Sequence, residues 1–136
     1  MDKYRDHGLL LLRVGIGASF MAHGWPKLAG GAAKWEKLGA AMKHLGIDFA
    51  PTFWGFMAAI SEFFGGLLLV LGVAWLPALA MLAGTMAIAS FMHIQKGDGF
   101  TGASHALESL VLFVSLALIG PGRFTITNQF AGGGKR

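Results

Sequence analysis

The sequence contains no cysteine and little charge. Of its 136 residues, only 13% are Asp, Glu, Lys or Arg, whereas soluble domains are about 25% charged. The absence of cysteine excludes disulfides, thiolate metal sites and cysteine-bound iron–sulfur clusters, so any redox chemistry must use a bound cofactor. Nucleic-acid binding is not indicated either. The net charge is +4, but the basic residues are scattered near the ends of apolar runs, which is typical of contacts with lipid headgroups.

Long apolar runs dominate the rest of the chain, and hydrophobic residues make up 54% of it. The runs cover residues 8–25, 52–76, 77–94 and 103–119. Because about 20 apolar residues cross a bilayer as a helix, the pattern predicts a single all-α membrane domain over residues 1–136. Short links between the runs predict four transmembrane helices in an antiparallel bundle. A cleaved signal peptide is the alternative for the first run, and the arginine inside that run argues against it.

Residues 26–51 form the only long connection between the runs. Its apolar residues recur at roughly helical spacing, with lysines on the other side. These apolar residues are Trp35, Leu38, Met42 and Leu45. The pattern predicts an amphipathic interfacial helix between spans one and two, lying among the headgroups and ending at Gly46. The C-terminal Gly-Gly-Gly-Lys-Arg is expected to fray.

Glu62 lies inside the second apolar run, about ten residues from its start, which places it near the middle of the membrane. A lone charge at that depth costs about 3 kcal/mol or more, so Glu62 needs a partner or a proton. Arg13 enters the bundle from the opposite face and has a long side chain. We therefore predict that Arg13 and Glu62 form a buried ion pair. A protonated Glu62 that is hydrogen-bonded to a neighbouring helix is the alternative.

Four more ionisable side chains are expected at the end of the bundle that bears the connection 26–51. His23 ends the first span, His93 ends the third, and His105 and Glu108 begin the fourth. Because alternating spans return these positions to the same end, we predict that they line one cavity open toward it. Interfacial or capping roles are the alternative for each of them. The residues suffice in number for a metal, and two histidines suffice for a haem, but no spacing signature indicates either cofactor.

Several short motifs follow one another in a fixed order along the chain. They are Leu11-Leu12-Arg13-Val14, His23-Gly24-Trp25-Pro26-Lys27-Leu28, Glu62-Phe63-Phe64-Gly65-Gly66-Leu67-Leu68-Leu69, Glu108, and Gly120-Pro121-Gly122-Arg123. In these motifs the chain resembles the DoxX family of small four-helix membrane proteins. The tail departs from that family, because Thr125-Ile126-Thr127 stands where relatives often have a Ser-Leu-Asp-like segment. The resemblance implies a membrane subunit linked to quinone-dependent sulfur oxidation, or to complexes that manage thiol and oxidative stress.

Together with the polar residues above, this resemblance implies a non-autonomous subunit of a quinone-linked oxidoreductase in a bacterial inner membrane, with partner subunits or further copies of itself. A quinone needs an apolar slot, a hydrogen-bond donor at each carbonyl and a proton supply. The predicted slot is lined by Phe63, Phe64 and Phe91. The predicted catalytic residues are Arg13, His23, Glu62 and Glu108, and the predicted cofactor-binding residues are Lys27, His93 and His105. A non-enzymatic scaffold or assembly factor is the main alternative function, and a small proton-coupled transporter is a further one.

Overall fold

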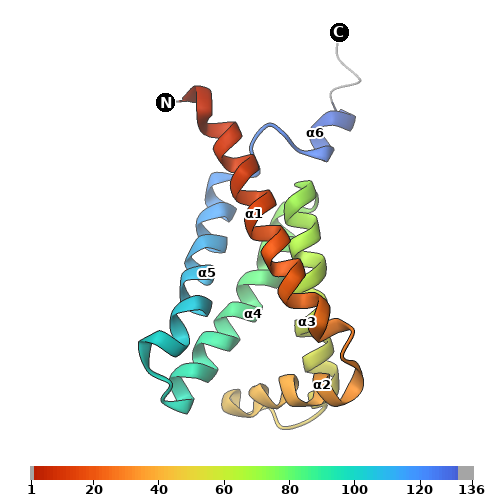
Figure 1. Cartoon of the computed structure of the whole chain (residues 1–136), viewed down its shortest axis with the longest axis vertical. Coiled ribbons are helices and arrows are strands. Elements are labelled where there is room, and N and C mark those ends of the chain that lie inside the picture. The colour runs from red at the N-terminus through yellow and green to blue at the C-terminus, as the bar shows by residue number, and fades with distance from the viewer. Residues whose placement is uncertain (1, 132–136) are drawn as a thin grey trace.

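The computed structural model describes residues 2–131, and every regular element in this range is a helix (Figure 1). The elements are α1 (Asp2–Leu28), α2 (Gly31–Gly39), the 3-10 helix η1 (Ala40–Leu45), α3 (Pro51–Leu71), α4 (Trp75–Lys96), α5 (Gly99–Ile119) and α6 (Ile126–Ala131). The glycine-rich C-terminal residues that were expected to fray lie outside the described residues.

The four long helices alternate in direction. From the end where α6 lies, α1 runs to the opposite end, α3 returns, α4 runs down again and α5 returns (Figure 1). Helix α1 packs on α3, α3 on α4, and α4 on α5, while α2 packs on the first part of α3. Below, the two ends of the molecule are called the α2 end and the α6 end.

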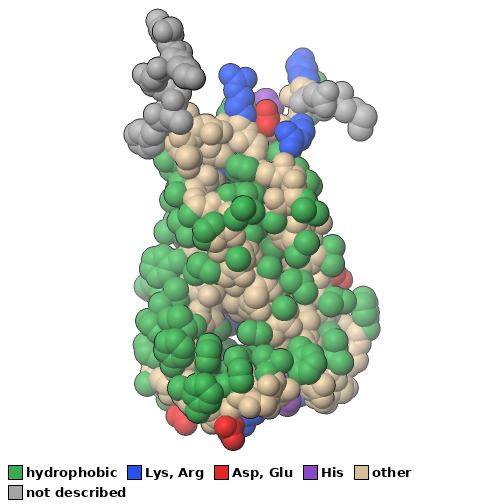
Figure 2. Space-filling view, turned by 180° about the vertical axis from the view of Figure 1, so that it is seen from behind, with side chains coloured by type: hydrophobic (Ala, Val, Ile, Leu, Met, Phe, Trp, Pro, Cys, Tyr) green, Lys and Arg blue, Asp and Glu red, His purple; other side chains and the backbone are tan. Residues whose placement is uncertain are grey.

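Three of these helices, α3, α4 and α5, are long and apolar enough to cross a membrane. Helix α1 is longer, but Arg13 and His23 interrupt its apolar run. Hydrophobic side chains cover much of the face seen in Figure 2, and most of its charged side chains gather at the two ends. The predicted all-helical fold is therefore confirmed for the described residues, with three candidate membrane spans, while a fourth span formed by α1 stays a prediction.

The link between α3 and α4 is longer than the sequence predicted. The expected span 52–76 ends early because Gly72 adopts a left-handed conformation, with φ 67°, and its N–H bonds the carbonyls of the last turn of α3. A glycine in this conformation is a common end of a helix. Helix α4 then begins at Trp75, and Pro77 lies in its first turn, where proline is well tolerated. The predicted amphipathic segment forms α2 and η1, and Gly46 ends it with φ 76°.

Glycines set how closely the helices approach. A Cβ added to Gly17 would lie 2.6 Å from the carbonyl oxygen of Gly66, and one added to Gly24 would lie 2.5 Å from the amide nitrogen of Phe63. Helices α1 and α3 are thus in backbone contact, as small residues allow in membrane bundles. Gly55 likewise lies against the backbone of Trp35 in α2. These contacts leave little freedom to slide α1 or α2 along α3.

The buried core lies between α1, α3, α4 and α5. Its members are Leu9, Phe20, Leu69, Leu79, Leu82, Met86, Ala106, Phe113 and Leu116. Phe20 of α1 and Phe113 of α5 meet edge to face, with ring centroids 4.9 Å apart. Such an aromatic pair adds about 1 kcal/mol beyond the area it buries, and it ties α1 to α5.

Candidate functional site

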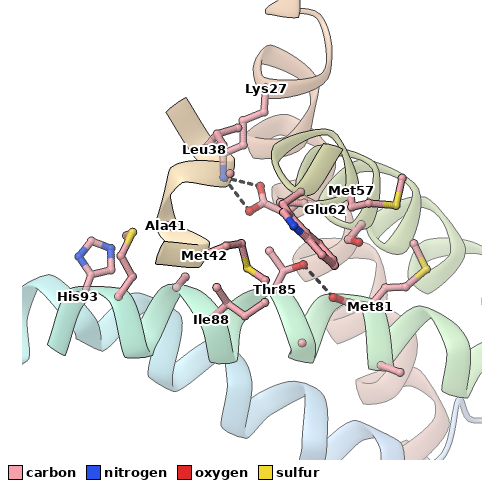
Figure 3. A pocket seen from close by; sticks show the side chains of 18 residues that line it. Lys27, Leu38, Ala41, Met42, Met57, Glu62, Met81, Thr85, Ile88 and His93 are labelled. Carbon is pink, nitrogen blue, oxygen red and sulfur yellow. Dashed lines mark hydrogen bonds and ion pairs between the residues drawn. The ribbon is translucent and has the colours of Figure 1, made fainter. Parts of the chain in front are cut away.

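A buried ion pair lies where α1 meets α3. Lys27, in the last turn of α1, donates from Nζ to both carboxylate oxygens of Glu62, at 2.7 and 2.6 Å (Figure 3). The Glu62 side chain is 4% exposed and that of Lys27 is 30% exposed. A charge-assisted pair that uses both oxygens satisfies a carboxylate which would otherwise be costly inside the bundle.

The predicted ion pair between Arg13 and Glu62 is wrong. Arg13 is 1% exposed and donates to the carbonyl oxygen of Phe124, beyond the end of α5. Its Nε and Nη1 have no hydrogen-bond partner within the described part of the chain. Arg13 therefore connects α1 to the segment at the α6 end, and Glu62 is neutralised from the other end of α1.

The register of α1 on α3 explains this exchange of partners. Gly17 lies against Gly66, and the two helices run in opposite directions (Figure 1). Arg13 is one turn before Gly17, so it lies beside the end of α3, next to Gly72. Glu62 is one turn before Gly66, so it faces the second half of α1, where Lys27 is the basic residue.

A cavity of about 510 Å³ lies on one side of the ion pair, between η1, α3 and α4 (Figure 3). Its wall is mostly apolar. The lining residues are Lys27, Leu38, Gly39, Ala41, Met42, Trp54, Met57, Ala58, Ser61, Glu62, Ala80, Met81, Gly84, Thr85, Ile88, Ala89, Met92 and His93. The Thr85 hydroxyl donates to the carbonyl of Met81 at 3.0 Å. The ionisable side chains of the lining are Lys27, Glu62 and His93. This space is called the apolar cavity below.

Methionine is the commonest long side chain of the apolar cavity. Met42 comes from η1, Met57 from α3, and Met81 and Met92 from α4. An unbranched thioether side chain adapts to irregular shapes better than branched aliphatic ones do. The lining can therefore adapt to apolar ligands of different shapes.

A second cavity, of about 230 Å³, lies on the other side of the ion pair. Its lining residues are Phe20, His23, Lys27, Glu62, Met86, Ala89, His93, Gly102, His105 and Ala106. The rings of His23 and His105 have centroids 5.8 Å apart. The structure thus brings His23, His93 and His105 together at one cavity, as predicted. This space is called the histidine cavity below.

The two cavities share part of their wall. Lys27, Glu62 and His93 line both of them. His93 also contacts Asp98, with 2.7 Å between Nδ1 and the carboxylate oxygen. The ion pair therefore lies between the apolar cavity and the histidine cavity and forms part of the wall of both.

Glu108 does not join this site. It is exposed, and it is not among the residues that line the histidine cavity. The prediction that it shares a cavity with the histidines is wrong, because the face of α5 that carries His105 and Ala106 turns toward α1 and α4 while Glu108 lies on another face. Within residues 2–131, no group of three or more His, Asp or Glu side chains is placed to hold a metal ion.

The predicted aromatic slot is also wrong. Phe64 and Phe91 are 43% and 37% exposed, and neither these two residues nor Phe63 lines the apolar cavity. The sequence does carry a signal for that cavity. Small residues follow one face of α4 at Ala80 and Gly84, and they leave space that the methionines only partly fill.

Comparison with known proteins gives one match. The family model for DoxX matches residues 8–95, which is more than half of the chain. The matched range contains the ion pair, Arg13, His23 and His93, and it ends before α5. Neither the curated proteins nor the solved structures gave a match.

Proposed function

The chain belongs to the DoxX family, and from this premise we propose that it is the membrane subunit of a quinone-linked oxidoreductase. The observation that carries the proposal is a mostly apolar cavity of about 510 Å³ with the Lys27–Glu62 ion pair in its wall. Pockets for small molecules are usually about 300–1,000 Å³ and largely apolar, with a few convergent polar groups. A quinone ring with part of its isoprenoid chain has that size and polarity.

The polar wall of the apolar cavity has the groups that a quinone ring requires. Lys27 and His93 can donate hydrogen bonds to quinone oxygens, and Glu62 can pass protons. Reduction of a quinone to a quinol takes up two electrons and two protons. The chain has no cysteine to ligate an iron–sulfur cluster, so in this proposal the electrons come from a partner subunit and the protons pass through this chain.

The histidine cavity supplies the proton route in this proposal. His23 and His105 are exposed at its rim, and Glu62 is buried at its inner wall. Histidine exchanges protons near neutral pH more readily than other side chains. A proton from water at the α2 end would pass the imidazoles, reach Glu62 and enter the apolar cavity beside Lys27.

The membrane position follows from the same geometry. We place α1 across the bilayer as a fourth span, because it packs on α3 through backbone contacts along much of its length. Helix α2 and η1 then lie at the headgroups, with Lys34, Lys37 and Lys43 exposed. In this arrangement the apolar cavity is entered from the lipid phase near the α2 end. A bacterial inner membrane is the proposed location.

A scaffold function is the second candidate, and a specific observation favours it. The ion pair uses both Glu62 oxygens, and the glycine contacts hold α1 and α2 on α3, as a purely structural cluster would. A scaffold does not require an apolar cavity, however, and we therefore rank it below the quinone proposal. A proton-coupled transporter ranks lower still.

Quinone binding is tested by calorimetric titration of the purified protein with a short-chain ubiquinone. Gly84 lines the apolar cavity, and a Cβ added there meets no atom within 4 Å, so Gly84→Phe should fill the cavity without a backbone clash. Gly15→Phe is the matched control, because Gly15 is exposed on α1 with the same free space around it.

We expect saturable binding to the wild type and to Gly15→Phe, and loss of binding in Gly84→Phe with an unchanged melting temperature. Equal binding to all three proteins would place the quinone elsewhere. Absence of saturable binding to the wild type would favour the scaffold.

A further inference from the structure

Glu108 is a carboxylate on the outside of a candidate membrane span. It lies nine residues after Gly99, the first residue of α5, so it is about 14 Å along a helix of 21 residues. That position is near mid-span, and the side chain is exposed. No hydrogen bond or ion pair reaches the Glu108 side chain from the residues that the structure describes. Ionisable side chains in membrane spans normally face the protein interior or a partner.

The same face of α5 carries a row of residues spaced alternately three and four apart. They are Thr101, Ser104, Glu108, Val111, Ser115 and Leu118, and each of them is exposed or half-buried. This spacing is the one by which a helix presents a continuous seam to a second helix. Ser104 and Ser115 donate to carbonyls of their own helix, at 3.1 and 2.8 Å, which leaves their hydroxyl oxygens free to accept. We call this row the outer seam.

Within the described residues, no lysine or arginine of a second copy is free to neutralise Glu108 from a matching depth. Of the lysines and arginines away from the helix ends or paired inside the bundle, Arg13 is buried and Lys27 is held by Glu62. The other described lysines and arginines lie near the ends of helices or in the segments that connect them. Contact between two copies through the outer seam would bring two carboxylates together, and like charges at close range are unfavourable.

We propose that the outer seam is the docking surface for a transmembrane helix of another protein that carries a lysine or arginine at mid-membrane. Charge complementarity selects such a helix, and the small side chains of Ser104 and Ser115 in the outer seam permit close approach of its backbone. This assignment gives Glu108 a binding role in place of the predicted catalytic one. It does not depend on what occupies the apolar cavity.

The test uses synthetic transmembrane peptides as the probe. Each peptide has the same leucine–alanine sequence with Lys, Gln or Glu at its centre, and its binding to the full chain in phosphatidylcholine vesicles is measured by energy transfer. We expect the Lys peptide to bind at least about tenfold more tightly than the Gln peptide, which corresponds to about 1.4 kcal/mol. The Glu peptide should bind most weakly. Glu108→Gln should abolish the preference for Lys.

A matched pair of variants tests the seam itself. Ser104→Phe puts a large side chain into the outer seam and should weaken binding of the Lys peptide. Ser19→Phe makes the same change at an exposed serine of α1, outside the outer seam, and should leave binding unchanged. Equal binding of the Lys and Gln peptides by the wild type would overturn the proposal. Dimerisation of the chain that is lost in Glu108→Gln would also overturn it, since a second copy would then be the occupant.

Discussion

Lys27 Nζ lies 2.7 and 2.6 Å from the two carboxylate oxygens of Glu62, across 35 positions of sequence. This contact joins the last turn of α1 to the middle of α3 and forms part of the wall of both cavities. One interaction thus joins two helices and also supplies polar groups of the candidate site. The structural role of the Lys27–Glu62 pair is measured by the free energy of unfolding, and its functional role is measured by ligand binding.

The first prediction concerns the energy of the Lys27–Glu62 pair. Lys27→Met leaves a carboxylate that is 4% exposed without a partner, so it should lower the free energy of unfolding by about 3 kcal/mol. Glu62→Gln should also destabilise, and the double variant should recover part of the combined loss. Unfolding in mixed micelles measures all four corners of the cycle.

The control for this cycle is Arg13→Gln combined with Glu62→Gln. Arg13 donates to the carbonyl of Phe124, beyond the end of α5 and away from Glu62, so these two substitutions should be additive within about 0.5 kcal/mol. A coupling energy between Arg13 and Glu62 that equals that between Lys27 and Glu62 would contradict the structure.

The second prediction uses two glycines on one helix. Gly17→Ala places a Cβ 2.6 Å from the Gly66 carbonyl oxygen, whereas Gly15→Ala meets no atom within 4 Å. The first change should destabilise by about 1–3 kcal/mol, as overpacking does, while the second should be neutral or slightly stabilising because alanine favours helix. Thermal unfolding of both variants gives the comparison, and equal melting temperatures would show that α1 and α3 are not in backbone contact.

The third prediction concerns Arg13 and the segment after α5. The hydrogen bond from Arg13 to the Phe124 carbonyl is charge-assisted, and such bonds contribute about 1.5–3 kcal/mol to stability. Arg13→Met should therefore speed amide hydrogen exchange around Thr125, which is 2% exposed. Exchange in the middle of α4 is the internal reference. Unchanged protection around Thr125 would mean that the segment is held without the guanidinium.

The fourth prediction concerns the accessibility of two carboxylates from lipid. Glu108 is exposed near the middle of α5, and Glu62 is buried and bonded to Lys27. A lipid-soluble carbodiimide should label Glu108 and leave Glu62 unmodified, as read by mass spectrometry of proteolytic fragments. Bound Lys peptide should protect Glu108. Labelling of Glu62 in preference to Glu108 would contradict the placement of Glu62 inside the bundle and of Glu108 on its surface.

Hydropathy predicted the helices well, because apolar runs of membrane length have few alternative structures. Alternation of the spans was also enough to gather His23, His93 and His105. The pairing of charges could not be predicted, because depth along a helix is uncertain by a turn or more until the register is known. The contact between Gly17 and Gly66 sets that register. Nor could depth alone show which face of α5 turns inward, so Glu108 was placed in the wrong compartment.

The most direct test of the central claim is the fluorescence of Trp54 during titration with a short-chain ubiquinone. Trp54 lines the apolar cavity, and the chain has four tryptophans, so Trp54→Phe identifies its share of the signal. We predict a saturable quenching component that disappears in Trp54→Phe and in Gly84→Phe and persists in Gly15→Phe. Quenching that never saturates, or that is equal in all four proteins, would contradict quinone binding in the apolar cavity.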